Sequence, residues 1–268
     1  MIQRMLPRQA HRARRAARAV LAIGAMSALL TVNIPDASAA PPLGVTVLAP
    51  ADGSAQRVGA LFAGGLDGGH YCTASVVRSD GHDVIATAAH CLGDVRDAVF
   101  VPGYRDGTAP YGVWQLTGQY VDPGWQSGQD PDADISFATV APLDGRRIED
   151  VVGGYPVIAE QPDDVTVTIV GYPASEETPL VCSNDTTMQS DTQRRIGCPD
   201  LTGGTSGSPW LADGALVGVL GGYQGGGEVP EVSYSAVMGD GAQELYREAA
   251  GRAADPGVHH WTRDTWWS

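Results

Sequence analysis

The feature that most limits the fold is a long series of short apolar segments, each of which ends at a turn signal. Glycine and proline, with 35 and 18 copies, supply most of these turns. Many short strands at regular spacing predict an antiparallel sandwich or barrel and disfavour alternating strands and helices. The expected strands are residues 58–62, 71–78, 83–88, 98–102, 111–121, 135–140, 165–171, 208–211, 216–221 and 232–235.

One segment has the period of a helix instead. Within residues 241–252 apolar side chains recur at i, i+3, i+4 and i+7, the spacing of an amphipathic helix; they are Ala242, Leu245, Tyr246 and Ala249. No other segment has this pattern. We therefore expect an all-β protein with a helix at its C-terminal end.

The length and composition indicate a folded chain. Its 268 residues suffice for one large domain or two small ones, and 43% of them are hydrophobic and 18% charged. We expect a domain at 58–252, preceded at 40–57 by an irregular lead-in or short pro-segment. For a Trp-rich tail at 253–268 the alternatives are packing on the domain, partial disorder, or binding of a polymer or partner.

The N-terminus has the three parts of a signal peptide. Residues 1–18 hold six arginines and no acid, an apolar run follows at 19–34, and Ala-Ser-Ala stands at 37–39. A membrane anchor is the alternative, but the run is short for a span and is interrupted by Gly24, Ser27 and Asn33. We expect cleavage near Ala39 and a secreted, extracellular protein.

The charge excludes two classes of partner. The chain has no lysine, and loss of the six arginines and Asp36 with residues 1–39 shifts its formal net charge from −14 to about −19. Such a surface repels polyanions, so we expect no binding to nucleic acid and, after signal cleavage, none to membranes.

Four cysteines suit an exported chain, where an even number predicts disulfides. Three pairings are possible, and pairing between sequence neighbours would give two clips, Cys72–Cys91 and Cys182–Cys198. A four-cysteine zinc site is the alternative, but it would require short Cys-x-x-Cys spacing, which is absent.

Three motifs contain residues that can carry nucleophilic catalysis. His90 ends the sequence Thr-Ala-Ala-His at an apolar strand, and Asp134 stands at the start of another. Ser206 lies in the run Gly-Gly-Thr-Ser-Gly-Ser-Pro-Trp at 203–210, where glycines permit a tight turn that presents the hydroxyl and nearby N–H groups. Taken singly, each motif has a structural interpretation: a core histidine, a strand cap and a surface loop.

Together, these motifs resemble the three signatures of trypsin/chymotrypsin-like serine proteases, and most closely those of the secreted bacterial branch. The chain order of His90, Asp134 and Ser206 is the chymotrypsin order. The resemblance covers about residues 58–250. It implies a fold of two antiparallel six-stranded β-barrels with the site between them.

The resemblance also implies roles. Ser206 would be the nucleophile, His90 its general base, and Asp134 the carboxylate that orients the imidazole. The N–H groups of Gly204 and Ser206 would form the oxyanion hole. Asp134 is preferred because it directly precedes the apolar strand; Asp130 and Asp132 are expected to be loop residues, with a calcium site as the alternative. We expect a monomer that acts on polypeptides without metal or cofactor.

Two departures from the family pattern matter. The residue before the nucleophile is Thr205, where the family's zymogens carry an aspartate that pairs with a freed N-terminus. Although Arg57-Val58-Gly59 resembles an activation site, we expect no such ion pair. The oxyanion hole must therefore be held in another way.

The residues of the expected substrate pocket have two interpretations. Asp200 has the spacing of the pocket-bottom aspartate that selects Arg or Lys, and an exposed turn residue is the alternative. The opposite wall is expected at Leu220, Gly221 and Gly222. Glutamate-specific relatives carry a histidine on this strand, and its absence here argues against acidic specificity.

Two other functions compete with a protease. A binding protein on an inactive protease fold would not need all three motifs. An esterase would place its serine first in chain order and between a strand and a helix, which this sequence does not do. The sequence therefore favours a serine endopeptidase that works through an acyl-enzyme.

Overall fold

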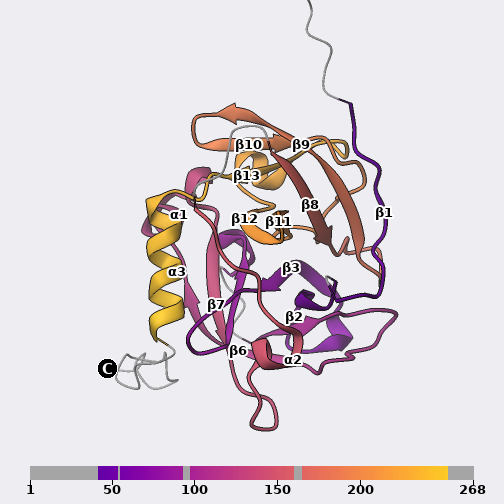
Figure 1. The fold of residues 1–268 in the computed structure, drawn as a ribbon, viewed down its shortest axis with the longest axis vertical. Helices are drawn as coiled ribbons and strands as arrows, with labels where there is room; N and C mark the ends of the chain where they lie inside the picture. Colours follow the sequence, from indigo (N-terminus) through magenta and orange to yellow (C-terminus); the bar gives the residue numbers. More distant parts are fainter. Residues whose placement is uncertain (1–41, 54, 93–96, 160–164, 253–268) are drawn as a thin grey trace, which may run out of the picture. The chain divides into compact units, whose positions relative to one another are not determined.

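The computed structural model consists mainly of two antiparallel sheets (Figure 1). The first is made by β2 to β7, and the second by β8 to β13 together with β1. The structure describes residues 42–53, 55–92, 97–159 and 165–252. The predicted signal peptide at 1–39 and the Trp-rich tail at 253–268 lie outside these residues. No helix in the described ranges has the length and apolarity needed to cross a membrane.

The first sheet is a closed six-stranded barrel, as predicted. Its order around the barrel is β2-β3-β4-β7-β6-β5, and all its ladders are antiparallel. Its strands are β2 (Val58–Ala63), β3 (His70–Val76), β4 (Val84–Thr87), β5 (Ala98–Pro102), β6 (Trp114–Tyr120) and β7 (Ser136–Val140).

The second sheet contains six strands in the order β12-β11-β8-β9-β10-β13, and a seventh, β1, pairs with β9. Unlike the first sheet, it curls without closing into a full hydrogen-bonded barrel. Its strands are β1 (Val47–Leu48), β8 (Thr166–Gly171), β9 (Leu180–Ser190), β10 (Gln193–Ile196), β11 (Pro209–Ala212), β12 (Ala215–Val219) and β13 (Ser233–Ala236).

A side chain explains why this sheet stays open between β12 and β13. The Val219 N–H donates to Ser235 Oγ at 3.1 Å, so a hydroxyl takes the place of a ladder carbonyl. At Gly218 an added Cβ would lie 2.4 Å from the same oxygen, so only glycine fits there. A backbone hydrogen bond joins the two segments again just past the end of β12, where the Gly221 N–H donates to the Tyr234 carbonyl at 2.9 Å.

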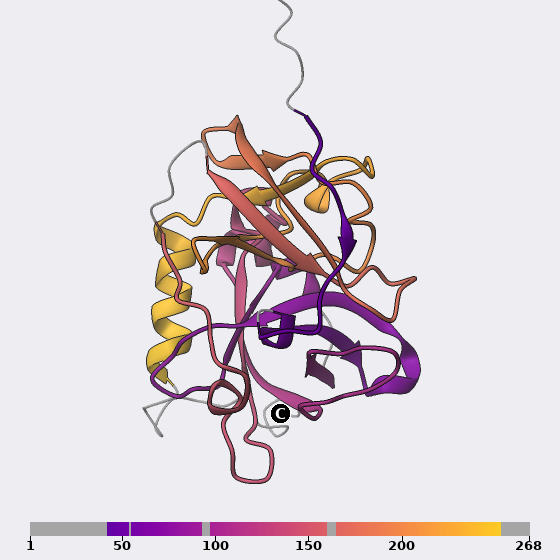
Figure 2. The same ribbon diagram turned by 45° about the vertical axis from the view of Figure 1, so that its right-hand side comes forward.

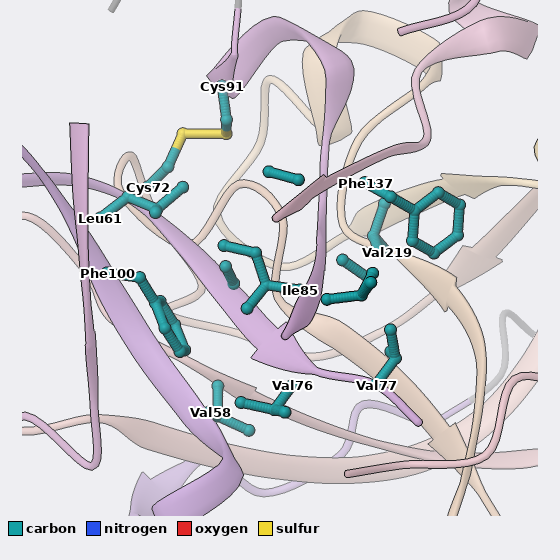
Figure 3. Packing of buried hydrophobic residues seen from close by; sticks show 14 of the residues in the cluster. Val58, Leu61, Cys72, Val76, Val77, Ile85, Cys91, Phe100, Phe137 and Val219 are labelled. Carbon is teal, nitrogen blue, oxygen red and sulfur yellow. A yellow bond between two sulfur atoms is a disulfide. The ribbon is translucent and has the colours of Figure 1, made fainter. Parts of the chain in front are cut away.

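The barrel interior is packed with branched and aromatic side chains, which gives the short apolar strands their stability. Every residue of β4 and β7 is buried, and Figure 3 shows Ile85, Phe100 and Phe137 turned into one shared cluster. A second cluster in the other sheet surrounds the fully buried Trp210.

The predicted C-terminal helix is confirmed as α3 (Asp240–Arg252). It packs on the first barrel, where the ring centroids of Tyr246 and Phe137 lie 5.4 Å apart (Figure 1). Two short helices were not predicted, α1 (Pro123–Gly128) and α2 (Ile148–Val152). The part of the chain that the structure describes also contains five 3₁₀ turns: η1 (Ala55–Arg57), η2 (Leu66–Gly68), η3 (Ala89–Cys91), η4 (Pro131–Ala133) and η5 (Tyr223–Gly226).

The four cysteines form two disulfides between sequence neighbours, Cys72–Cys91 and Cys182–Cys198. The first links β3 to the turn that carries His90. The second links β9 to the segment that follows β10. Each sheet therefore has one disulfide, and the alternative of a four-cysteine zinc site is wrong.

The lead-in segment belongs to the second sheet. Besides the β1 pairing, the Gly44 N–H donates to the Gly197 carbonyl at 2.8 Å and the Thr46 hydroxyl to the Pro199 carbonyl at 2.5 Å. Figure 2 shows this segment running down the side of β9. The lead-in therefore contacts the residues that directly precede Asp200 in the chain.

Candidate active site

His90 is fixed on a short turn at the end of β4. The strand ends at Thr87, and the following 3₁₀ turn contains both His90 and Cys91, whose disulfide to Cys72 ties the turn back to β3. The histidine side chain keeps 25% of its surface exposed. A rigid backbone thus presents a partly accessible imidazole.

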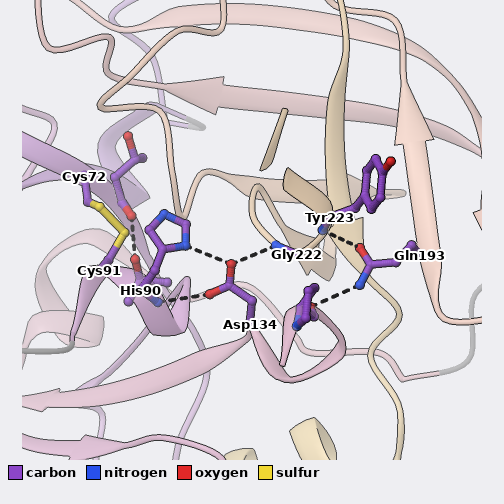
Figure 4. Close-up of polar contacts among 10 residues, drawn as sticks. Cys72, His90, Cys91, Asp134, Gln193, Gly222 and Tyr223 are labelled. Carbon is purple, nitrogen blue, oxygen red and sulfur yellow. Dashed lines mark hydrogen bonds and ion pairs between the residues drawn. A yellow bond between two sulfur atoms is a disulfide. The ribbon is translucent and has the colours of Figure 1, made fainter. Parts of the chain in front are cut away.

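Asp134 lies beneath this imidazole and is fully buried. Its Oδ2 accepts from His90 Nδ1 at 2.8 Å and from the Gly222 N–H at 2.7 Å, and its Oδ1 accepts from the His90 N–H at 3.0 Å (Figure 4). A buried carboxylate without partners would be costly, and these three N–H donors offset that cost. Because a carboxylate oxygen only accepts, Nδ1 carries the proton and Nε2 is left as the acceptor in the neutral ring.

The other two aspartates of this segment serve the turn. The Asp130 carboxylate accepts from the Asp132 N–H at 3.0 Å and caps η4. The Asp132 carboxylate accepts from Gln193 Nε2 at 2.7 Å. Of the three aspartates in this segment, Asp134 is the one that contacts His90.

Ser206 lies on a tight turn pressed against the histidine segment. The Thr73 N–H donates to the Ser206 carbonyl at 2.7 Å. Its neighbour Gly207 has φ +81°, and a Cβ there would lie 2.1 Å from Thr87 Oγ1 and 3.0 Å from Ala88 N. No hydrogen bond joins the Ser206 hydroxyl to His90 in the described ranges; the contacts of this turn are with Thr73 and with Thr87 and Ala88, which precede His90.

The N–H groups of Gly204 and Ser206, on the same turn, have no partner among the described residues. The Gly203 carbonyl accepts from Ala174 N at 2.7 Å, and because the peptide is planar and trans, the Gly204 N–H points the opposite way. Neither this N–H nor that of Ser206 donates to any acceptor among the residues that the structure describes. Their neighbours Thr205, Gly207 and Ser208 all donate to backbone carbonyls. Unpaired N–H groups such as those of Gly204 and Ser206 can stabilise a developing oxyanion if both point into the same space.

Thr205 holds the turn from inside. Its side chain is buried, and its hydroxyl and N–H both donate to the Thr202 carbonyl, at 2.6 and 3.0 Å. Its methyl side packs against Gly171, where an added Cβ would lie 3.2 Å from Thr205 Cγ2. A local hydrogen bond and packing therefore occupy the position where the family's zymogens place a buried aspartate.

The residues predicted for the substrate pocket separate into two groups. Leu220, Gly221 and Gly222 are buried; the Gly222 N–H binds Asp134, and a Cβ at Gly221 would lie 2.8 Å from Asp134 Oδ2. Asp200 is exposed, with φ +67°, and its N–H donates to the Pro230 carbonyl at 3.0 Å. The geometry of Asp200 is that of a turn residue.

Three contributions to the site were missed from the sequence. The Gly222 N–H binds Asp134, whereas the sequence predicted Gly222 only as part of a pocket wall. Trp125, on α1, stands beside the His90 ring with 6.1 Å between ring centroids. Gln193 bonds to the segments on either side of Asp134. A backbone N–H and a polar residue on a strand carry no motif that would have identified them.

The side chains offer little for a metal at this site. Cys72, His90 and Cys91 bring possible ligand atoms within 4.8 Å of one another. Both sulfurs, however, are joined in the disulfide, so neither can act as a thiolate ligand.

A glycine-rich serine turn, a histidine bonded to a buried carboxylate and two antiparallel sheets are the features of the double-barrel serine proteases. The family model described as "Trypsin-like peptidase domain" matches residues 72–219, more than half of the chain. The chain belongs to the trypsin-like peptidase family.

Solved structures agree with this assignment. The chain is 28% identical to the protease Anisep from Arthrobacter nicotinovorans, with a TM-score of 0.68 over 77% of this chain and 100% of that one. It is also 28% identical to the thermostable serine protease AL20 from an extremophilic microorganism, with a TM-score of 0.67 over 75% and 99%. A Glu endopeptidase, at 18% identity and a TM-score of 0.63 over 78% and 97%, shares the fold. No curated protein matches the chain.

Proposed function

We propose that this chain is a secreted serine endopeptidase that uses Ser206, His90 and Asp134. The observation that carries the proposal is the 2.8 Å hydrogen bond between His90 Nδ1 and Oδ2 of the buried Asp134. This contact leaves Nε2 free to accept a proton. The residues just before His90, Thr87 and Ala88, also pack against Gly207, the neighbour of Ser206. Family membership supports proteolysis as the reaction.

The proposed reaction has two halves. The Ser206 oxygen attacks the peptide carbonyl carbon as His90 Nε2 takes its proton, and the N–H groups of Gly204 and Ser206 bind the oxyanion. The carbon–nitrogen bond then breaks, the imidazolium gives its proton to the leaving amine, and an acyl-enzyme remains. Water attacks the ester, His90 takes a proton from it, and the proton returns to the serine as the carboxylate product leaves.

Labelling by a fluorophosphonate probe tests the nucleophile. Wild type should be labelled and Ser206→Ala should not, because the probe reacts with an activated serine hydroxyl. Ser175→Ala is the matched control, since Ser175 is exposed on a loop and should leave labelling unchanged. A folded wild type that is not labelled would favour the alternative, a binding protein on an inactive protease fold.

A preference for cleavage after Arg or Lys is a finer part of the proposal and depends on Asp200. Its spacing from Ser206 supports such a role, but its carboxylate is exposed, and exposed ion pairs are weak. We therefore expect Asp200→Ala to reduce the preference for Arg over Ala by only about 2–5-fold. Peptides that vary only the residue before the cut measure this ratio, with Asp213→Ala as the control. An unchanged ratio would remove Asp200 from the pocket.

Secretion is inferred from the signal-peptide pattern, which lies outside the described residues. The two disulfides support an oxidising compartment. N-terminal sequencing of protein recovered from a culture medium tests the inference: a mature chain should begin near residue 40, and retention inside the cell would contradict it.

A further inference from the structure

Gln193, on the second sheet, makes polar contacts across to the loop that carries Asp134. It is the first residue of β10, where its backbone pairs with Ala236 and Ser190, and the residue is only 4% exposed. A buried amide at the start of a strand requires partners for its polar atoms. It finds them on two different segments of the active site.

One side of the amide binds the aspartate turn. Gln193 Nε2 donates to the Pro131 carbonyl at 3.0 Å and to Asp132 Oδ1 at 2.7 Å. Both residues belong to η4, and Asp134 is the residue that ends this turn. The amide nitrogen therefore fixes the backbone from which the Asp134 carboxylate projects.

The other side of the amide binds the segment that contacts the carboxylate itself. Gln193 Oε1 accepts from the Tyr223 N–H at 2.9 Å. The preceding residue, Gly222, donates its N–H to Asp134 Oδ2 at 2.7 Å. Figure 4 shows this line of contacts running from His90 through Asp134 and Gly222 to Tyr223 and Gln193.

The amide also fits closely against Gly222. That glycine has φ +78°, and a Cβ on it would lie 2.4 Å from Gln193 Oε1 and 3.0 Å from Ala236 N. The segment therefore has no room to move toward β10. With both N–H groups and an oxygen lone pair of Gln193 engaged, the carboxylate is held on two sides.

We propose that Gln193 is a positioning residue that fixes Asp134 against His90 and sets the orientation of the imidazole. The proposal rests on the proposed function, because it gives the amide a role in the same reaction. Asp134 and His90 belong to the first barrel, while Gln193, Gly222 and Ser206 belong to the second half of the chain. The amide thus ties the base to the half of the chain that carries the nucleophile.

The first test replaces the amide with a side chain of similar length and no hydrogen bonds. Gln193→Met should lower kcat by about 10- to 100-fold, the order of effect expected when a catalytic group is misplaced by a fraction of an ångström to one ångström. The low-field proton NMR signal of His90 Nδ1–H should shift or broaden. Gln56→Met is the matched control, since Gln56 also links two segments through its amide, to Tyr111 at 2.9 Å and Val152 at 3.5 Å.

The second test first replaces the hydrogen bond between Gln193 and Asp132 by a repulsion between two carboxylates, and then restores an amide–carboxylate pair with the two groups exchanged. Gln193→Glu places a carboxylate against Asp132 and should reduce kcat more than Gln193→Met does. Adding Asp132→Asn supplies an amide donor to the new carboxylate and should recover much of the loss. Recovery would not be expected if position 193 only filled space.

Each result decides the proposal. A kcat for Gln193→Met equal to that of Gln56→Met, or an unchanged His90 signal, would overturn it. If wild type neither cleaves peptides nor reacts with the fluorophosphonate, the proposed function fails, but the His90 signal in wild type and variant still tests the positioning role.

Discussion

Thr73 connects more of the candidate site than any residue singled out in the sequence. It is fully buried on β3, next to Cys72. Its hydroxyl donates to the Gly204 carbonyl and accepts from the Tyr172 N–H, both at 3.0 Å, while its N–H binds the Ser206 carbonyl at 2.7 Å. These bonds fix the carbonyl of each residue whose N–H would line the oxyanion hole.

Removing this hydroxyl should damage both stability and rate. Thr73→Val keeps the shape but leaves the buried Tyr172 N–H and Gly204 carbonyl without a partner, which should lower the free energy of unfolding by about 1–3 kcal/mol. We expect kcat to fall about 10- to 100-fold as the turn loosens. Urea unfolding and steady-state kinetics measure the two effects.

A conservative variant separates the hydroxyl from the methyl group. Thr73→Ser retains both hydrogen bonds and loses one methyl, worth about 1 kcal/mol. Its kcat should stay near that of wild type. If Thr73→Val were as active as Thr73→Ser, the hydroxyl would have no part in shaping the turn.

At this scale the sequence was informative where a residue type has a chemical role and uninformative where it only holds another residue. Asp134 could be chosen over Asp130 and Asp132 because it directly precedes an apolar strand, and its contact with His90 agrees with that choice. Gln193 could not be identified, because a glutamine in a polar stretch gives no sign that it will be buried.

Among the elements, the apolar strands of the first barrel could be predicted and the polar strands of the second sheet could not. Strands β4 and β7 are buried on both faces, so they appear in the sequence as continuous apolar runs. Strand β9 has exposed or half-buried residues along most of its length. Its run of Ser, Asn, Asp and Thr is not apolar, so no strand was predicted there.

Strand β1 was missed for a different reason. It has only two residues, Val47 and Leu48, both exposed, and it exists because β9 offers an edge for pairing. The lead-in was expected to be irregular or a pro-segment. Its contacts with Gly197 and Pro199 show that it also reaches the segment before Asp200.

Deleting this element tests whether it is part of the enzyme. A mature chain that begins at Ala49 loses the β1 ladder and the bonds of Gly44 and Thr46. Each bond contributes about 0.5–1.5 kcal/mol and is partly offset by chain entropy, so we expect a net loss of about 2 kcal/mol. Urea unfolding measures it, with Val45→Ser, at a 77% exposed position, as the control. A removable pro-segment would instead leave the shortened chain as stable and at least as active.

At the scale of the molecule, the candidate site is formed by two sheets, of which the first closes into a barrel and the second stays open. The closed first barrel carries His90 and Asp134, and the open second sheet carries the Ser206 turn and the Gly222 contact. The family resemblance predicted two barrels. It did not predict the opening between β12 and β13, because that depends on one hydroxyl, Ser235, and one glycine, Gly218.

The closed barrel also bears on activation. Val58 is fully buried at the start of β2, where its carbonyl accepts from the Gly103 N–H at 2.9 Å. The guanidinium of Arg57 packs over the Tyr155 ring at 5.2 Å. The peptide bond between Arg57 and Val58 thus lies at the edge of the closed barrel, directly before its first strand. Thr205 has no carboxylate that could pair with a new N-terminus.

We therefore expect activity without cleavage at this bond. Brief treatment of the folded protein with trypsin should leave the Arg57–Val58 bond intact, because a protease needs an extended segment that the barrel does not release. Mass spectrometry of the products and the rate of peptide hydrolysis before and after treatment measure this. Cleavage at Arg57–Val58 accompanied by a large rise in kcat would mean that a freed Val58 amine orders the oxyanion turn, and that the Thr205 hydrogen bonds alone do not hold it.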